Sequence, residues 1–134
     1  MGIHWLLALA MTASCEAYTQ GLKRADDGGV PLVVLIGADW CHACKVMDKR
    51  IQTEIDKDLL AAIAYAYIDL DEHPRLARGL SGEGALPQLI AFWKTDDGWK
   101  RSIVRGSRSV KALEKVLYGW IKQADEAGKD LTDE

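Results

Sequence analysis

The amino-acid sequence predicts an α/β domain in which a central mixed β-sheet of about four strands is covered by helices on both faces. The apolar run Leu32–Ile36 has the composition of a strand that is buried on both sides. Segments with strand and helix periodicity follow one another along most of the chain, which is typical of a layered α/β fold. The pair Cys41 and Cys44 stands where that first strand gives way to an amphipathic helix. The functional site is therefore expected at the junction between this strand and this helix.

Length and composition indicate one folded domain. The 134 residues are 49% hydrophobic, which suffices for a single core. The 17 basic and 20 acidic residues are scattered along the chain and give a net charge of −3, so nucleic acid is not an expected partner. The sequence contains no low-complexity segment and no repeat. We expect a leader at residues 1–17, a domain at residues 18–126 and a polar tail at residues 127–134.

The apolar run Trp5–Ala13 predicts an export signal. It is shorter than the roughly 20 residues that a membrane-spanning helix needs, and it fits the core of about 7 to 15 residues found in signal peptides. Cleavage after Ala17 would release a mature chain that begins at Tyr18. The first residues carry no Lys or Arg, which departs from the usual signal pattern. The prediction is an exported protein of the periplasm or cell envelope.

Two other interpretations of this first segment stay open. The stretch Thr12–Cys15 resembles a lipoprotein cleavage box, which would place a lipid on Cys15 and attach the protein to a membrane. Alternatively, an ordered helix begins near Ile3 and packs its apolar face on the domain. Cys15 would then be a small buried hydrophobic residue.

The first elements of the domain are expected to be helix, strand and helix. Apolar side chains share one face of a helix over residues 18–27, which Gly28 and Gly29 would end. The buried strand at residues 32–36 follows. A second helix is predicted from Cys41 through about Leu60. Its apolar side chains recur at four-residue intervals: Met47, Ile51, Ile55 and Leu59.

The middle of the chain predicts three further strands. Residues 62–70 alternate and are rich in Ile and Tyr, as in a half-buried strand, and residues 75–80 are expected to form a short helix. Residues 89–93 and 99–105 predict an antiparallel hairpin with its turn at residues 95–98.

The last element is predicted to be a helix that Ser107 or Ser109 caps. It should lie against the sheet through a wide apolar stripe. The stripe consists of Val110, Leu113, Val116, Leu117, Trp120, Ile121 and Ala124. After Gly128 the polar tail is expected to fray.

Cys41 and Cys44 have the spacing of a redox pair. Two cysteines three positions apart are too close to staple a long loop. A thiol in the first turn of a helix faces unpaired backbone N–H groups and the positive end of the helix dipole, which lowers the pKa of Cys41. Cys44 lies one turn further on, within bonding reach and on the sheltered side of the turn. We therefore expect Cys41 to be the nucleophile and Cys44 to resolve the mixed disulfide.

An isolated pair of this spacing can also be half of a zinc site or have no function. The sequence has no second pair to complete such a site, and His42 adds at most a third ligand in an awkward position. We expect no metal and, because disulfide exchange needs only the two thiols, no cofactor. Protonated His42 would instead stabilise a neighbouring thiolate and make the disulfide more oxidising.

Three marks together resemble the thioredoxin superfamily: Ala38–Lys45 (Ala-Asp-Trp-Cys-His-Ala-Cys-Lys) after an apolar strand, Leu86–Pro87 before a later strand, and Gly106 before the last helix. The resemblance covers residues 18–126 and is greatest to exported members such as the C-terminal domain of DsbD. It implies the thioredoxin fold and a monomeric protein-disulfide oxidoreductase, expected to act as a reductase. Its partners would be protein disulfides and an upstream thiol–disulfide electron donor.

The resemblance also implies a substrate-binding surface beside the cysteine pair. The bond before Pro87 would be cis, and the turn would expose the Leu86 backbone for β-type pairing with an extended substrate. Trp40, which lies near the dithiol in this family, would belong to the same docking surface and help to tune the redox pair. From the residues alone, Pro87 could instead simply open a strand, and Trp40 could be a core residue.

Two positions concern the proton of the resolving thiol. Thioredoxins usually carry a buried aspartate six residues before the first cysteine, and here that place holds Leu35. The DsbD-like domains also have an acid seven residues after the first cysteine, which Asp48 matches. Our hypothesis is that Asp48 assists the deprotonation of Cys44; the alternative is a solvated carboxylate on the helix surface.

Two functions of other classes stay open beside the oxidoreductase. A redox-inert module could hold extended peptides on the Leu86–Pro87 edge. A metallochaperone could use the thiols of Cys41 and Cys44 to carry a metal ion.

Overall fold

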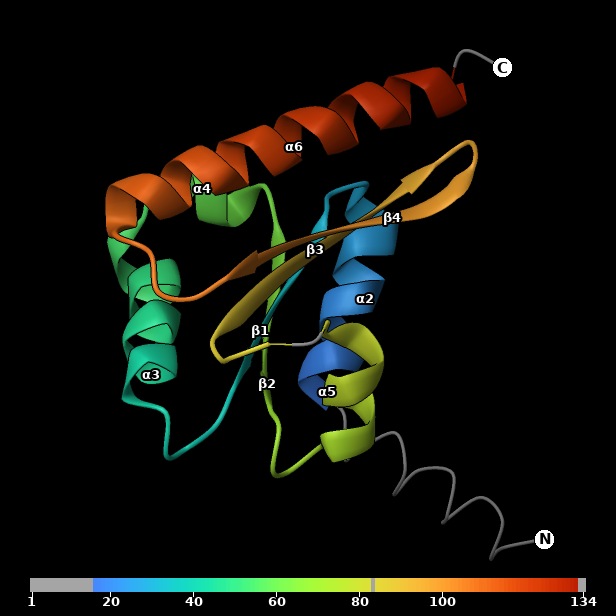
Figure 1. Ribbon diagram of the computed structural model, residues 1–134. Helices are drawn as coiled ribbons and strands as arrows, with labels where there is room; N and C mark the ends of the chain where they lie inside the picture. The colour runs from blue at the N-terminus through green and yellow to red at the C-terminus, as the bar shows by residue number, and fades with distance from the viewer. Residues whose placement is uncertain (1–15, 83, 133–134) are drawn as a thin grey trace, which may run out of the picture.

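The structure is a computed structural model that describes residues 16–82 and 84–132 (Figure 1). Most of the leader expected at residues 1–17 lies outside the described residues, and so does Cys15. The three interpretations of that leader therefore stay predictions. Within the part of the chain that the structure describes, no helix is long and apolar enough to cross a membrane.

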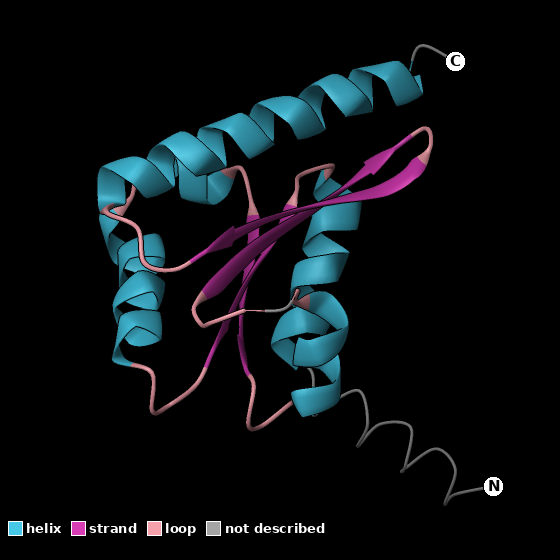
Figure 2. Ribbon diagram, viewed as in Figure 1, coloured by secondary structure: helices cyan, strands magenta, loops and turns pink. Residues whose placement is uncertain are grey.

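A mixed four-stranded sheet forms the centre of the domain (Figure 2). Its strands are β1 (Leu32–Gly37), β2 (Ala64–Asp69), β3 (Gln88–Thr95) and β4 (Gly98–Arg105). They lie in the order β2-β1-β3-β4, with β1 parallel to β2, antiparallel to β3, and β3 antiparallel to β4. Every residue of β1 is buried, as its unbroken apolar composition predicts. The predicted mixed sheet is confirmed.

Helices cover both faces of this sheet, as predicted (Figure 1). One face carries α2 (Glu16–Gly28) and α5 (Pro74–Leu80); the other carries α3 (His42–Lys49), the π-helical turn η1 (Arg50–Glu54), α4 (Lys57–Ala61) and α6 (Val110–Thr132). Side chains alternate along β1 and so divide the core in two. Val33 and Leu35 join the cluster under α3 and α6. Leu32, Val34 and Ile36 join the cluster under α2 and α5.

The helix expected from Cys41 through about Leu60 is interrupted, so that prediction is wrong in part. Helix α3 passes into η1, where the N–H of Ile55 donates to the Arg50 carbonyl at 3.0 Å, and Ile55 itself is extended with φ −74° and ψ 163°. Asp56 then caps α4 by accepting the Asp58 N–H at 2.8 Å. Ile55 is nevertheless buried, at 6% exposed. The four-residue spacing of apolar side chains predicts which face of the segment is buried, but it does not require the helix to be continuous.

The last helix is longer than expected. Ser109, one of the two predicted caps, accepts the N–H of Ala112 at 3.2 Å. The prediction that the chain frays after Gly128 is wrong for residues 129–132, because α6 continues to Thr132. Gly128 lacks the positive φ with which glycine ends many helices, and a glycine inside a helix costs only about 1 kcal/mol. An exposed ion pair between Lys129 and Asp125 at 3.5 Å spans this part of α6.

Candidate active site

Cys41 and Cys44 lie at the start of α3, as predicted. Strand β1 ends at Gly37, and a tight turn follows in which the Cys41 N–H donates to the Ala38 carbonyl at 3.0 Å. Cys41 is the N-cap residue of α3, and its Sγ accepts the backbone N–H of Cys44 at 3.2 Å. The two cysteines form a disulfide with their Cα atoms 5.3 Å apart. The backbone N–H groups of the first helical turn thus face the Cys41 sulfur.

The two sulfurs differ in access. Cys41 is partly exposed, whereas Cys44 is 0% exposed and lies on the buried side of α3. A disulfide on another protein can therefore approach Cys41 from outside, but it cannot reach Cys44. This asymmetry separates the two cysteines into an attacking and a sheltered group.

Trp40 lies on the surface beside Cys41. Its side chain is 69% exposed, so the core alternative is wrong for this residue. The indole Nε1 donates to Oδ2 of Asp71 at 2.9 Å, which fixes the ring against the loop after β2. His42 is also exposed, as the first residue of α3. The two chain neighbours of Cys41, Trp40 and His42, are therefore both exposed.

The Leu86–Pro87 peptide bond is cis and lies at the same end of the sheet as the disulfide. Gln88, the next residue, pairs with Ile36 near the carboxyl end of β1, which places the turn level with the chain leading to Cys41. The Pro87 carbonyl accepts the N–H of Gly106 at 2.9 Å, so its position is fixed on the β4 side. Pro87 is buried and Leu86 is half-buried.

Gln88 is a supporting residue that the sequence analysis did not identify. Its side chain is 1% exposed; Oε1 accepts the Gly82 N–H at 3.1 Å, and Nε2 donates to the carbonyls of Gly82 at 3.1 Å and Gly84 at 3.3 Å. These bonds tie the loop before Pro87 to the first residue of β3. The available signal was an amide at the start of an otherwise apolar strand, because a buried amide needs partners.

Asp48 faces β2 from α3. One of its oxygens, Oδ1, accepts the hydroxyl of Tyr65 at 2.6 Å and the amide of Gln52 at 2.8 Å. Burial, followed by this hydrogen bond, raises the pKa of Tyr65 well above its ordinary value. Asp48 is half-buried and bonded, so it is not merely a solvated carboxylate. Leu35, at the place where thioredoxins usually carry an aspartate, is fully buried in the apolar core.

Gly37 allows β2 and α3 to approach each other closely at the disulfide. A Cβ atom on Gly37 would lie 2.6 Å from Oη of Tyr67 and 2.9 Å from Cβ of Cys44. The tyrosine hydroxyl and the buried cysteine therefore flank the same small space. Burial raises the pKa of Tyr67 to about 12, and nearby carboxylates add to the shift: Asp69, Asp48, Asp39 and Glu72.

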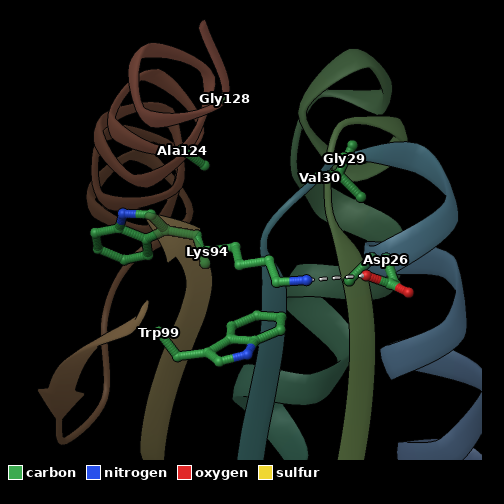
Figure 3. A pocket seen from close by; sticks show the side chains of 9 residues that line it. Asp26, Gly29, Val30, Lys94, Trp99, Ala124 and Gly128 are labelled. Carbon is green, nitrogen blue, oxygen red and sulfur yellow. Dashed lines mark ion pairs between the residues drawn. The ribbon is translucent and has the colours of Figure 1, made fainter. Parts of the chain in front are cut away.

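Among the residues that the structure describes, no group of three or more His, Cys, Asp or Glu side chains could hold a metal ion. A pocket of about 140 Å³ lies at the opposite end of the sheet from the disulfide, between α2, β3, β4 and α6 (Figure 3). Trp93 and Trp99 contribute its aromatic side chains, and Lys94 crosses it toward Asp26. This pocket touches neither cysteine.

The strand order, the helices on both faces and the cysteine pair at the start of α3 define a protein with the thioredoxin fold. A solved thioredoxin from Thermus thermophilus superposes with a TM-score of 0.62 at 24% identity, covering 76% of this chain and 82% of that one. A disulphide isomerase from Xylella fastidiosa Temecula1 superposes with a TM-score of 0.59 at 21% identity, covering 77% and 89%.

In sequence, the chain is similar to the mitochondrial thioredoxins of mammals. It is 29% identical to the bovine protein over 97 residues, which are 72% of this chain and 57% of that protein. The mouse protein is 27% identical over 96 residues, again with 57% of its length covered. The chain therefore spans little more than half the length of these relatives. No protein-family model matches the chain.

Proposed function

We propose that this protein is a thiol–disulfide oxidoreductase that acts on the disulfides of other proteins. One observation carries the proposal: a disulfide at the start of α3 joins a partly exposed Cys41 to a fully buried Cys44. That arrangement supplies one sulfur for attack and a second for resolution. The similarity to thioredoxins in sequence supports the same reaction class.

In the reducing direction the cycle starts from two thiols. The Cys41 thiolate attacks one sulfur of a substrate disulfide; a Cys41–substrate disulfide forms, and the other substrate sulfur leaves with the electron pair and takes up a proton. Cys44 then loses its proton and attacks Cys41 Sγ. The Cys41–Cys44 disulfide forms and the second substrate sulfur leaves as a thiol. The substrate gains two electrons and two protons, and a dithiol donor restores the protein by the same exchange.

Substrate would dock around Trp40 and the Leu86–Pro87 turn. The exposed indole offers a fixed apolar surface beside Cys41. The turn lies level with the end of β1, and its backbone would pair with an extended substrate segment. Both contacts are sequence-tolerant, which suits an enzyme that acts on many proteins.

His42 and Asp48 are proposed to adjust the two thiols. Protonated His42 lies next to Cys41 in the chain and would stabilise its thiolate. Asp48 lies one turn from Cys44 on the same helix and would assist the loss of its proton. A redox titration of His42→Gly should give a lower reduction potential than the wild-type protein; equal potentials would exclude the first role.

We further propose an exported, DsbD-like reductase of the periplasm or cell envelope that acts as a monomer and is kept reduced by an upstream thiol–disulfide donor. The segment Ala38–Lys45 and the apolar run Trp5–Ala13 support this assignment. The mass of the protein purified from its own cells distinguishes cleavage after Ala17 from a lipid on Cys15. A full-length cytosolic protein would contradict export.

The proposal is tested by the reduction of insulin with dithiothreitol as the electron donor. The wild-type protein should accelerate the reaction, and Cys41→Ser should return it to the rate of dithiothreitol alone. Cys44→Ser should still attack but remain bound to substrate through Cys41, which non-reducing gels and mass spectrometry detect. Peptide binding without catalysis would instead identify a redox-inert module. Stoichiometric metal bound to the reduced protein would identify a metallochaperone.

A further inference from the structure

The burial of Cys44 disfavours the ionised form of its thiol. Cys44 is 0% exposed, and an apolar environment disfavours the thiolate that must attack Cys41. Leu35 occupies the place of the usual buried aspartate and offers no polar atom. Asp48 is proposed to assist the loss of the proton, but a carboxylate cannot donate a hydrogen bond to the thiolate that forms, so a donor beside Cys44 would stabilise that charge.

Tyr67 is the polar side chain that the fold brings to this place. It projects from β2 on the same face as Tyr65 and packs against the cluster that contains α3. The position that a Cβ atom on Gly37 would occupy lies 2.6 Å from Tyr67 Oη and 2.9 Å from Cys44 Cβ. The separation of these two atoms therefore cannot exceed the sum of the two distances, so the hydroxyl lies beside the Cys44 side chain, at a separation that one bridging water spans.

We infer that the Tyr67 hydroxyl donates the hydrogen bond that stabilises the Cys44 thiolate during its attack on the mixed disulfide. This inference rests on the proposed thiol–disulfide exchange and adds a residue to it. In the step, Cys44 gives up its proton and bonds Cys41 Sγ, while the substrate sulfur leaves with the electron pair and is protonated. Tyr67 keeps its own proton throughout. A donor serves this purpose because a thiolate is an acceptor only.

The surroundings of Tyr67 keep its hydroxyl in the donor form. Negative groups surround Tyr67 from the loop before Cys41, from α3 and from the end of β2: Asp39, Asp48, Asp69 and Glu72, with Tyr65 adjacent. Burial above all, and these carboxylates in addition, raise the pKa of Tyr67 to about 12, so its hydroxyl is a donor throughout the physiological range.

A disulfide reagent that releases a coloured thiol allows the rates of the two steps of exchange to be measured separately. One equivalent of dithiobis(nitrobenzoate) is mixed with the reduced full-length protein in which Cys15, the third thiol, is replaced by serine. The first thionitrobenzoate is released when Cys41 attacks, and the second when Cys44 resolves the mixed disulfide. Stopped-flow absorbance between pH 6 and pH 9 gives both rate constants.

Tyr67→Phe should leave the first phase within about twofold of wild type and slow the second about tenfold at neutral pH, because a bond to a charged group is lost. The pH profile of the second phase should shift upward by about one unit. Tyr118→Phe, which removes a 63% exposed phenol on α6, is the matched control and should leave both phases unchanged. Fluorotyrosine at position 67, which restores the hydroxyl, should restore the second phase.

Three outcomes would overturn the inference. A second phase in Tyr67→Phe within twofold of wild type at every pH excludes the hydroxyl as a donor. A fluorotyrosine protein as slow as Tyr67→Phe assigns the effect to packing. A wild-type protein that releases no colour, or whose release survives Cys41→Ser, overturns the proposed function itself and this inference with it.

Discussion

The two ends of the sheet are held in different ways. At the carboxyl end of β1, polar groups are buried and bonded: Gln88, 1% exposed, ties down the loop before Pro87. At the amino end of β1, Lys94 reaches Asp26 at 3.9 Å and lies 5.8 Å over the Trp99 ring. Those side chains are largely exposed, with Lys94 at 60% and Asp26 at 65%.

The difference follows from the surroundings of each contact. In a dry environment a polar bond is strong, and the loss of one partner leaves the other unsatisfied. In water the same bond competes with solvent and is screened by salt. The loop before Pro87 is therefore held by bonds that are costly to lose, whereas the contacts of Lys94 at the opposite end are easily exchanged. Substitutions at the two ends should differ accordingly.

The largest effect is expected at Gln88. Gln88→Ala removes three hydrogen bonds and leaves a buried cavity, so the free energy of unfolding should fall by about 3 kcal/mol. Urea denaturation measures this loss. Gln52→Ala, which removes one exposed bond to Asp48, is the control and should change stability by less than about 0.5 kcal/mol. Equal losses in both variants would contradict the comparison.

A methyl group on Gly37 is the next largest disturbance. Gly37→Ala places a Cβ within 3 Å of Tyr67 and Cys44, so the free energy of unfolding should fall by about 2 kcal/mol. Gly79→Ala is the matched control, because that helical site has no atom within 4 Å and no positive φ. It should be neutral or stabilising by up to about 1 kcal/mol. The pair is compared by thermal and urea unfolding; a neutral Gly37→Ala would show that the space is not tight.

Alkaline pH should weaken the disulfide end through its tyrosines. The pKa of Tyr67 is about 12 in the folded protein and near 10.0 in the unfolded chain. Its contribution is complete below pH 10 and is lost as the pH rises toward 12, since the unfolded chain releases its proton first. Tyr67 is partly exposed, so solvent screening limits the effect to about 1 kcal/mol or less.

Urea midpoints between pH 8 and pH 11 test this dependence. Tyr67→Phe should lose less stability over that range than the wild-type protein, while Tyr118→Phe should follow the wild type. Parallel curves for wild type and Tyr67→Phe would show that the tyrosine has the same pKa folded and unfolded.

The smallest effect is expected at the other end of the sheet. Lys94→Met removes the exposed pair with Asp26 and the contact with Trp99 but keeps an apolar stem, so stability should change by less than about 0.5 kcal/mol. The same urea measurement, repeated at high salt, checks it. A loss comparable to that of Gln88→Ala would remove the distinction between the two ends.

Much of this architecture could be predicted from periodicity and local chemistry. An unbroken apolar run placed β1 in the interior, and the spacing of the cysteines at a helix start placed Cys41 outside and Cys44 inside. Those features depend on neighbours in the chain. The break at Ile55 could not be predicted, because it is partly fixed by Glu114 of α6, whose carboxylate accepts the N–H of Asp56 at 2.9 Å.

The supporting residues of the site were missed for a related reason. Tyr67 was visible only as part of an alternating strand, and its nearness to Cys44 depends on the pairing of β1 with β2 and on the absence of a side chain at Gly37. For Trp40 the residue itself was predicted but its hydrogen-bond partner was not, because Asp71 lies in a loop 31 positions away. Sequence separation hides contacts that only the folded chain brings together.

The depth of Cys44 has a consequence for oxidative damage. Hydrogen peroxide can oxidise the accessible Cys41 of the reduced protein to a sulfenic acid, the step that precedes irreversible sulfinic and sulfonic products. A second sulfur stands within bonding distance, so condensation yields the ordinary disulfide and water before a further oxidant arrives. The buried cysteine thus converts a lesion into a normal state of the protein, which any reductant of that disulfide can repair.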